Sequence, residues 1–494
     1  MSPLLIGLIV YSLLILGVGF MAVRRNRTLD AYLLADRKLG PWVAAFSERA
    51  SGESAWLLIG LPGLAFVIGL SAFWVGVGCV SGIAFSWFVV ARRLREETGR
   101  INALTLADYF EARHEGRSHA LRLTATAIIL FFFTFYVAAQ FLAAGKVLNV
   151  YLGVTEFQGM LIGAVLVLFY TAAGGLFAVA WTDLIQGVIM LLTLALLPLA
   201  MLHELGGWAV LQERLAAAGG GRADWIPAGK PWLAEAGFLG SLAIGLGYMG
   251  QPHLVLRFMA ISSGAEIGKG RIIAISWAVI AFAGAVLVGL AGLAYYGLDG
   301  AGGILADKEH LMPTAARDFM PEWLAVIMIC GAIAAMMSTA DSQLLASASA
   351  ISEDIYRRIL RPDADQRRLL TIGRWATLAI GIVALILAWQ VDDFVYSLVL
   401  YAWAGLGAAF GPPLVLSLWW RGTSRAGVLA GFISGTVVVV VWHEIPALVA
   451  TVYEMIPGFF VSLGATWLFS RLYPPRPAAR RSRFLEIADK EELS

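Results

Sequence analysis

The sequence predicts an all-α membrane protein with about thirteen transmembrane helices. Of its 494 residues, 59% are hydrophobic and only 14% are charged, whereas soluble domains average about 25% charged residues. Apolar runs long enough to cross a bilayer core of about 30 Å recur from one end of the chain to the other. Only helices and closed barrels satisfy every backbone amide in lipid. Because these runs are continuous rather than alternating, we expect helices.

Charge and cysteine content exclude several classes of protein. The formal net charge of +2 gives no basis for nucleic-acid binding, and two cysteines, Cys79 and Cys330, cannot build a metal cluster. The first apolar run, residues 3–23, lacks a basic leader and a small-residue cleavage motif. It is therefore predicted to be a spanning helix and not a signal peptide.

The expected spans and their flanking charges set a topology. The spans are centred near residues 13, 58, 82, 134, 163, 191, 246, 283, 335, 380, 406, 435 and 460. Basic residues cluster in alternate loops, at residues 24–38, 92–100, 257–271, 357–368, 421–425 and 476–483. The positive-inside rule makes these loops cytoplasmic. We expect a bacterial inner-membrane protein with its N-terminus outside and its C-terminus inside.

Two expected spans are interrupted by small and polar residues at membrane depth. One interruption covers residues 50–63 and the other covers residues 245–253. Each opens a stretch of five spans, at 40–203 and 236–419, and paired interruptions are typical of inverted-repeat transporters. The alternative is ordinary glycine-mediated helix packing. The remaining segments are a first helix and loop (1–39), an outer loop (204–235), two further helices (420–474) and a tail (475–494).

Hydroxyl and carboxyl groups inside the predicted spans indicate an ion site, because a buried charge is costly and needs a reason. Helical spacing places Ala335, Ser338, Thr339 and Ser342 on one face, with Asp341 beside it. Together with Asp183, this face could bind Na⁺ or exchange a proton. The alternatives are hydroxyl bonds to the same helix and an ion pair between Asp341 and a buried basic residue. The adjacent residues Glu48 and Arg49 are expected at the cytoplasmic mouth, outside the site.

Aromatic side chains at similar depth in different spans suit a small ring or aliphatic solute. They are Trp56, Tyr136, Tyr248 and Trp403. Simple packing is the alternative for each of them.

Several long motifs then occur in order. They are residues 56–63 (WLLIGLPG), 102–110 (NALTLADYF), 178–183 (AVAWTD), 247–253 (GYMGQPH), 338–345 (STADSQLL), 352–356 (SEDIY), 401–405 (YAWAG) and 407–412 (GAAFGP). With these motifs the chain resembles the sodium/solute symporter family over nearly its whole length, and within it the sodium/proline symporters.

The resemblance implies a LeuT-type core of two inverted five-helix repeats, with one extra helix before it and two after it. It implies Na⁺-coupled import of L-proline by alternating access. It places a sodium ion at Ala50, Glu53, Ala335, Ser338 and Thr339, and a second sodium or coupling site at Asp183, Asp341 and Ser342. The substrate would contact Ser54, Trp56, Tyr136, Gln140, Tyr248, Pro252 and Trp403.

Three positions depart from the proline carriers. Gly52 replaces their aspartate, Glu53 their methionine, and Ile244 their tryptophan. The same fold could therefore carry another amino acid or small organic solute. A membrane sensor is a second alternative, although the tail is too short for a signalling domain, and no enzyme motif is present. The expected partners are the solute and membrane lipid, with no nucleic acid, and the protein is expected to be a monomer or weak homo-oligomer.

Overall fold

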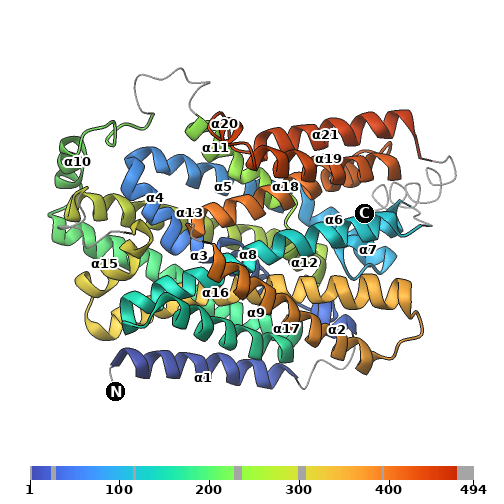
Figure 1. The fold of residues 1–494 in the computed structure, drawn as a ribbon, viewed down its shortest axis with the longest axis horizontal. Helices are drawn as coiled ribbons and strands as arrows, with labels where there is room; N and C mark the ends of the chain where they lie inside the picture. Colours follow the sequence, from blue (N-terminus) through green and yellow to red (C-terminus); the bar gives the residue numbers. More distant parts are fainter. Residues whose placement is uncertain are drawn as a thin grey trace.

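A computed structural model describes residues 3–23, 29–114, 118–226, 236–298, 307–391 and 394–475. In these ranges the protein is helical, and the only β feature is an isolated bridge between Leu39 and Ile261. Most of the long helices run along one common direction (Figure 1). The predicted fold class is confirmed. Arg24, Arg25, Arg27 and nearly all of the tail lie outside the described residues.

The first half of the chain forms the following elements. They are α1 (Pro3–Val23), α2 (Leu29–Leu34), η1 (Ala35–Arg37), α3 (Pro41–Ala55), η2 (Trp56–Gly60), α4 (Leu61–Ile68), η3 (Gly69–Ala72), α5 (Phe73–Phe85), η4 (Ser86–Val90), α6 (Ala91–Ile101), α7 (Leu106–Arg113), α8 (Ala120–Leu152), α9 (Glu156–Leu205) and α10 (Trp208–Ala217).

The second half continues in the same style. Its elements are α11 (Ala236–Ala243), η5 (Ile244–Met249), α12 (Pro252–Ala260), α13 (Gly264–Tyr296), η6 (Lys308–His310), α15 (Leu311–Phe319), α16 (Glu322–Ser349), η7 (Ala350–Leu360), α17 (Gln366–Gln390), α18 (Val395–Trp419), α19 (Arg425–His443), α20 (Pro446–Val449) and α21 (Met455–Leu472).

These elements account for the expected spans. Among the described residues, nine helical stretches are long and apolar enough to cross a bilayer, and three shorter apolar helices join them. One of the nine, Pro41–Ile101, has 61 residues, about three times what a single crossing needs and enough for two crossings. It turns back at Gly69, whose φ is +73°. Each of the thirteen predicted centres thus falls within its own helical crossing.

Helices break where the sequence places small and polar residues. Within α3, Ser54 has φ 43° and ψ −170°, and a turn of π-helix follows at η2. The second interruption is the 3₁₀ segment η5, after which Gln251 is extended and α12 begins at Pro252. Proline suits a first helical position, because the amide it lacks would have no partner there. Both interruptions lie in crossings that were predicted to contain them.

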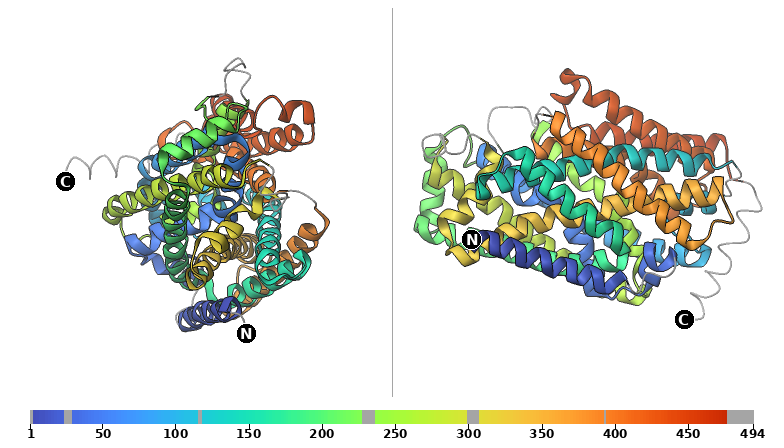
Figure 2. Two further views of the ribbon diagram at one scale, coloured as in Figure 1. Left: turned by 90° about the vertical axis from the view of Figure 1, so that its left-hand side faces the viewer. Right: turned by 60° about the horizontal axis from the view of Figure 1, so that its bottom comes forward.

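The core of the bundle is built around α3 and α16. The helix α3 packs against α9, α13 and α16, and it is buried from Val43 to its end. In contrast, α1 and α21 lie at opposite edges of the bundle (Figure 2). The outer helix α17 exposes Trp375 and Trp389, at 68% and 65%. Apolar exposure of this kind is what a lipid-facing surface requires.

Candidate functional site

The hydroxyls of α16 contact the backbone of α3 just before its break. Ser338 Oγ donates to the Ala50 carbonyl at 2.9 Å, and Thr339 Oγ1 donates to the Ser51 carbonyl at 2.9 Å. Ser338 also reaches the Ala335 carbonyl at 3.2 Å. All of these residues are buried. Unwound carbonyls next to hydroxyls are the oxygens that coordinate sodium in transporters of this kind, so the donor set suits a small monovalent cation.

Glu53 is the member of the expected sodium set that differs. Its carbonyl accepts the Trp56 amide, and among the described hydrogen bonds none joins that carbonyl to α16. Its carboxylate is engaged elsewhere: Glu53 Oε2 accepts from the Tyr248 hydroxyl at 2.9 Å and Oε1 accepts from Arg49 Nη1 at 2.5 Å. The side chain therefore faces Tyr248, one of the residues expected to contact the solute.

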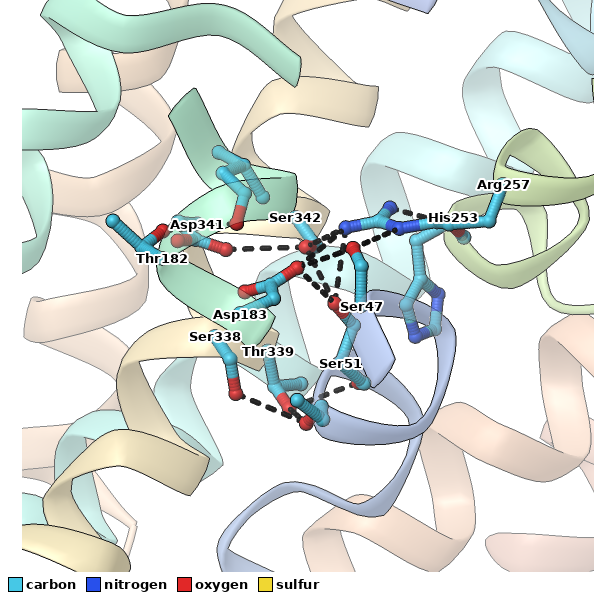
Figure 3. A network of polar contacts seen from close by, with 12 residues as sticks. Ser47, Ser51, Thr182, Asp183, His253, Arg257, Ser338, Thr339, Asp341 and Ser342 are labelled. Carbon is cyan, nitrogen blue, oxygen red and sulfur yellow. Dashed lines mark hydrogen bonds and ion pairs between the residues drawn. The ribbon is translucent and has the colours of Figure 1, made fainter. Parts of the chain in front are cut away.

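A second cluster surrounds Asp183, on the α9 crossing that packs against α3 (Figure 3). Asp183 Oδ2 accepts hydrogen bonds from Ser47 at 2.6 Å and from Ser51 at 3.1 Å. Ser51 in turn lies 2.9 Å from Ser342, whose hydroxyl donates to Asp341 Oδ1 at 3.1 Å. The three predicted coupling residues, Asp183, Asp341 and Ser342, are thus brought together by α9 and α16.

The cluster already contains a positive charge, supplied by Arg257 of α12. Its Nη2 lies 3.2 Å from Asp183 Oδ2 and 3.0 Å from Ser51, and also donates to Ser342. Its Nε donates to Ser47 at 3.1 Å. Arg257 is 1% exposed. Arg257 was expected in a cytoplasmic loop, and that expectation is wrong, because the residue is buried in α12.

A third buried group of charges lines the other side of α3. Arg49 Nε donates to Glu48 Oε2 at 2.6 Å, and the same oxygen accepts from Trp87 Nε1 at 3.1 Å. Arg49 and Glu48 are 0% and 1% exposed. The expectation that they lie at the cytoplasmic mouth is therefore wrong. Arg49 bridges Glu48 and Glu53. Arg49 and Glu53 are four residues apart and therefore lie on neighbouring turns of α3.

The predicted substrate aromatics fall into two groups. The rings of Tyr248 and Trp403 lie 4.6 Å apart and those of Tyr136 and Trp403 lie 6.5 Å apart, all with edge-to-face geometry. Trp56 instead packs against Phe282 and Tyr396, at 5.7 and 6.1 Å. The Trp403 indole donates to the Ile244 carbonyl of η5 at 2.8 Å. Trp403 thus contacts the backbone of the second interruption. Position 244, where the resemblance to proline carriers leads us to expect a tryptophan, holds Ile244.

Polar residues beside the two breaks complete this region. Gln140 Oε1 accepts the Ala55 amide at 3.1 Å, and Ser54 Oγ accepts the Trp56 amide at 3.3 Å, so both hold the broken end of α3. Next to Pro252, Gln251 donates its side-chain amide to the Trp403 carbonyl at 3.0 Å. Gln251 Oε1 is buried and has no partner among the described residues. Gln251 was not among the site residues expected from the sequence, although it lies in the motif at residues 247–253.

Comparisons with known proteins decide the family. A family model described as the sodium:solute symporter family matches residues 32–435. The chain belongs to the sodium:solute symporter family. The sodium/proline symporters of Salmonella typhimurium and Escherichia coli are each 39% identical to it, over 98% of this chain and 96% of theirs. The high-affinity proline transporter of Bacillus subtilis is 38% identical over 96% of this chain and 98% of its own.

Solved structures show the fold of this symporter. A Na⁺-coupled sialic acid symporter, in a substrate-bound outward-open state, has a TM-score of 0.80 at 18% identity, covering 96% of this chain and 99% of that one. MhsT in complex with L-phenylalanine has a TM-score of 0.55 at 13% identity, covering 87% and 97%. The expected LeuT-type fold is confirmed. The protein is a multi-pass membrane transporter and not an enzyme, and its family couples solute movement to sodium.

The charge count explains what the symporter's Asp183 cluster can accept. Arg257 contributes one positive charge to a buried cluster with two carboxylates, Asp183 and Asp341. Buried charges are tolerated when they are balanced and hydrogen-bonded. With both carboxylates ionised the cluster is one positive charge short of neutrality. This arrangement can therefore hold one further monovalent cation.

Proposed function

We propose that this symporter imports L-proline, driven by sodium, through alternating access. The observation that carries the proposal is the contact of Ser338 and Thr339 with the carbonyls of Ala50 and Ser51. It joins the broken helix to α16 at the position where the family pattern expects sodium. The proline-transporting relatives support the choice of solute, since they match nearly the whole chain.

Sodium would be held by the carbonyls of Ala50, Glu53 and Ala335 with the hydroxyls of Ser338 and Thr339. Each hydroxyl now uses its hydrogen on α3 and keeps lone pairs for a cation. A bound ion would fasten α3 to α16 and fix the position of the break. Coupling of this kind between two sites is typically worth about 1–3 kcal/mol. Ion binding would thereby prepare the pocket for the solute.

The solute pocket would be formed by Tyr136, Tyr248 and Trp403, with Trp56, Pro252, Ser54 and Gln140 nearby. Aromatic faces provide a large apolar surface for a pyrrolidine ring. At the broken end of α3 the Ala55 amide donates to the Gln140 side chain, and a solute carboxylate would replace that side chain as the acceptor. The unpartnered Gln251 Oε1 is an acceptor suited to the secondary ammonium of proline.

Uptake of radiolabelled proline into proteoliposomes tests this function. We expect concentrative uptake under an inward Na⁺ gradient, and none under an H⁺ gradient or without a gradient. A folded protein that takes up no proline under any gradient would contradict the choice of solute.

A second candidate is the same sodium-driven transport of a different small amino acid or organic solute. The observation that favours it is the Arg49–Glu53 pair, which places a carboxylate on the Tyr248 hydroxyl, at a position where proline carriers have methionine. A panel of unlabelled solutes competing with proline, or stabilising the protein thermally, would distinguish the two candidates. Stronger competition by another solute than by proline itself favours the second one.

The arrangement in the membrane is part of the proposal. The N-terminus would be outside and the C-terminus cytoplasmic. Residues 40–203 and 236–419 would form the two repeats, flanked by the segments 1–39 and 420–474, with 204–235 as an outer loop and 475–494 as the tail. The protein would act as a monomer or weak homo-oligomer in contact with lipid and without nucleic acid. The clustering of basic residues in alternate loops supports this arrangement.

A further inference from the structure

A cavity of about 450 Å³ lies at one end of the bundle, between the turn that follows α18 and the last turn of α21. Its lining residues are Trp420, Arg421, Gly422, Ser470, Arg471 and Pro474. It is distant in the fold from the break in α3 and takes no part in the sites described above. The end of α18 contacts α6 and α7 through Arg93 and Arg113, so the cavity lies at the end of the bundle where α6 and α7 also end (Figure 1).

The walls of the cavity are fixed by hydrogen bonds that join α19 to α21. The Ser424 amide donates to Ser470 Oγ at 3.0 Å, and the Ser424 side chain caps α19 by accepting the Gly427 amide at 3.2 Å. Thr423 Oγ1 donates to the Leu416 carbonyl at 2.8 Å. Because the turn is tied to both neighbouring helices, the positions of Arg421 and Arg471 are set by the fold.

The chemistry of the lining favours an anion at the level of lipid headgroups. Among the described lining residues two are arginines and none is acidic. The Arg471 guanidinium lies 5.5 Å from the Trp420 ring and 5.8 Å from the Trp467 ring. Arginine stacked on tryptophan keeps its edge free to bind a phosphate. Tryptophan is also enriched where a bilayer meets water.

An apolar surface on α21 leads to these arginines. Phe460, Trp467, Leu468 and Leu472 are 57%, 50%, 46% and 60% exposed. Their spacing places them on the same outward side of the helix as Arg471. The outer surface therefore offers acyl chains a continuous apolar path, with a cationic cavity at its end. A free phosphate would use only the cavity, whereas a lipid would use both.

We propose that this cavity binds the phosphate of an anionic membrane lipid, held by Arg421 and Arg471. The acyl chains of that lipid would lie along the exposed side of α21. The lipid would join the turn after α18 to the end of α21.

Native mass spectrometry of the full-length protein, released from nanodiscs containing phosphatidylglycerol and phosphatidylcholine, tests this site. The test variant is Arg421→Gln with Arg471→Gln. The control variant, Arg367→Gln with Arg368→Gln, removes the same charge from exposed residues of α17 expected on the same side of the membrane. We expect the control and the unmodified protein to retain one phosphatidylglycerol that the test variant binds about 30-fold more weakly, the equivalent of about 1 kcal/mol for each arginine.

Two further measurements keep the result decisive. If the double glutamine variant does not fold, Arg471→Lys keeps the charge and removes the forked geometry, and it is expected to bind the lipid more weakly than the unmodified protein. Equal lipid retention in the test and control variants would overturn the proposal. Displacement of phosphatidylglycerol by millimolar inorganic phosphate, with phosphate retained in its place, would show an anion site without lipid selectivity and would also overturn it.

Discussion

Single hydroxyls and charges carry most of the proposed ion chemistry. The hydroxyls of Ser338 and Thr339 donate to carbonyls of α3, which a bound cation could share. Arg257 supplies a charge that no substitution of similar size could replace, because it reaches three hydroxyls and a carboxylate at once. Loss of the Ser338 and Thr339 hydroxyls is therefore expected to lower ion affinity, whereas loss of Arg257 is expected to lower stability.

Replacing Ser338 and Thr339 together by alanine removes both hydroxyls from the proposed sodium site. We expect the sodium concentration that half-saturates uptake to rise at least about tenfold, because each lost ligand is worth about 1 kcal/mol. Uptake measured against sodium concentration in proteoliposomes checks this. Ser349→Ala is the matched control, since among the described residues that buried hydroxyl bonds only within its own helix, to the Leu345 carbonyl at 2.6 Å. An unchanged sodium dependence in the double variant would remove these residues from the site.

Replacing Arg257 by glutamine leaves the carboxylate of Asp183 without its buried counter-charge. Breaking a buried pair by removing one partner typically costs about 3–5 kcal/mol. Thermal unfolding in detergent should therefore show a much lower Tm for Arg257→Gln than for the exposed control Arg367→Gln. Adding Asp183→Asn should restore part of the loss, because the uncompensated charge disappears. If the second substitution lowers the Tm further, the ion pair is not what holds the cluster together.

At the scale of elements, the helix breaks are the features that position the site. The chain bends at Ser54 in α3, at Gly175 in α9 and at η5, and each bend has a local reason in small residues or in Pro252. Gly175 has φ 58° and ψ −178°, a conformation that is essentially restricted to glycine. The break at Gly175 divides α9 into two crossings.

Gly175→Ala should destabilise the fold by about 1–3 kcal/mol, because alanine is strained in that conformation. Gly268→Ala in α13 is the control. No atom lies within 4 Å of its added methyl, and alanine favours helix by up to about 1 kcal/mol. The two variants should therefore shift the Tm in detergent in opposite directions. Equal shifts would show that backbone strain at Gly175 is not the cause.

A short segment, Asp307 followed by η6, is tied to α8. Lys146 lies 2.7 Å from Asp307 and 2.6 Å from Glu309, and Glu309 accepts the first two amides of α18. Burial alone would raise the pKa of Asp307, but its hydrogen bond with Lys146 and that from the Glu309 amide lower it below the ordinary value of 3.8.

A lowered carboxyl pKa stabilises the fold above the unfolded-state value, and that stability is lost as the pH falls through the folded-state value. The unmodified protein should therefore unfold at a higher temperature than Asp307→Asn at pH 7. The gap should be at most about 1 kcal/mol for this partly exposed pair, and it should narrow as the pH is lowered below about 4. A gap that stays constant down to pH 3 would contradict the ion-pair explanation.

At the scale of the whole molecule, the orientation in the membrane determines from which side sodium enters the protein. The described residues form thirteen crossings, so the two ends of the chain lie on opposite sides of the membrane if every crossing is complete. Both native cysteines are buried, which leaves the surface free for single-cysteine labelling.

Glu213→Cys on α10 and Arg367→Cys on α17 test the orientation, since both positions are exposed. With a membrane-impermeant maleimide applied to intact cells, we expect Glu213→Cys to react at once. Arg367→Cys should react only after the membrane is permeabilised. The reverse pattern would place the N-terminus in the cytoplasm.

Much of this architecture is predictable from the sequence, because it depends on local properties. The length of apolar runs determines the crossings, Gly and Pro mark the breaks, and the hydroxyls of Ser338 and Thr339 point to a site through their spacing alone. The partners of the buried charges are not local. Arg257 meets Asp183 across 74 residues of sequence, and Arg49 is buried because of how α3 packs, so their neighbours follow only from the packed bundle.

The guanidinium of Arg257 already contacts Asp183, so a further cation in this cluster would have to bind beside it. Arg257 is carried by α12, whose first residue ends the second helix interruption. A cation that approaches Asp183 is repelled by the guanidinium of Arg257 on α12. The two cations can share the carboxylate only at the cost of that repulsion. Binding of that ion would then be coupled to a displacement of α12. A fluorescent or spin label on α12 would therefore report whether the Asp183 cluster has bound an ion, even when no solute is transported.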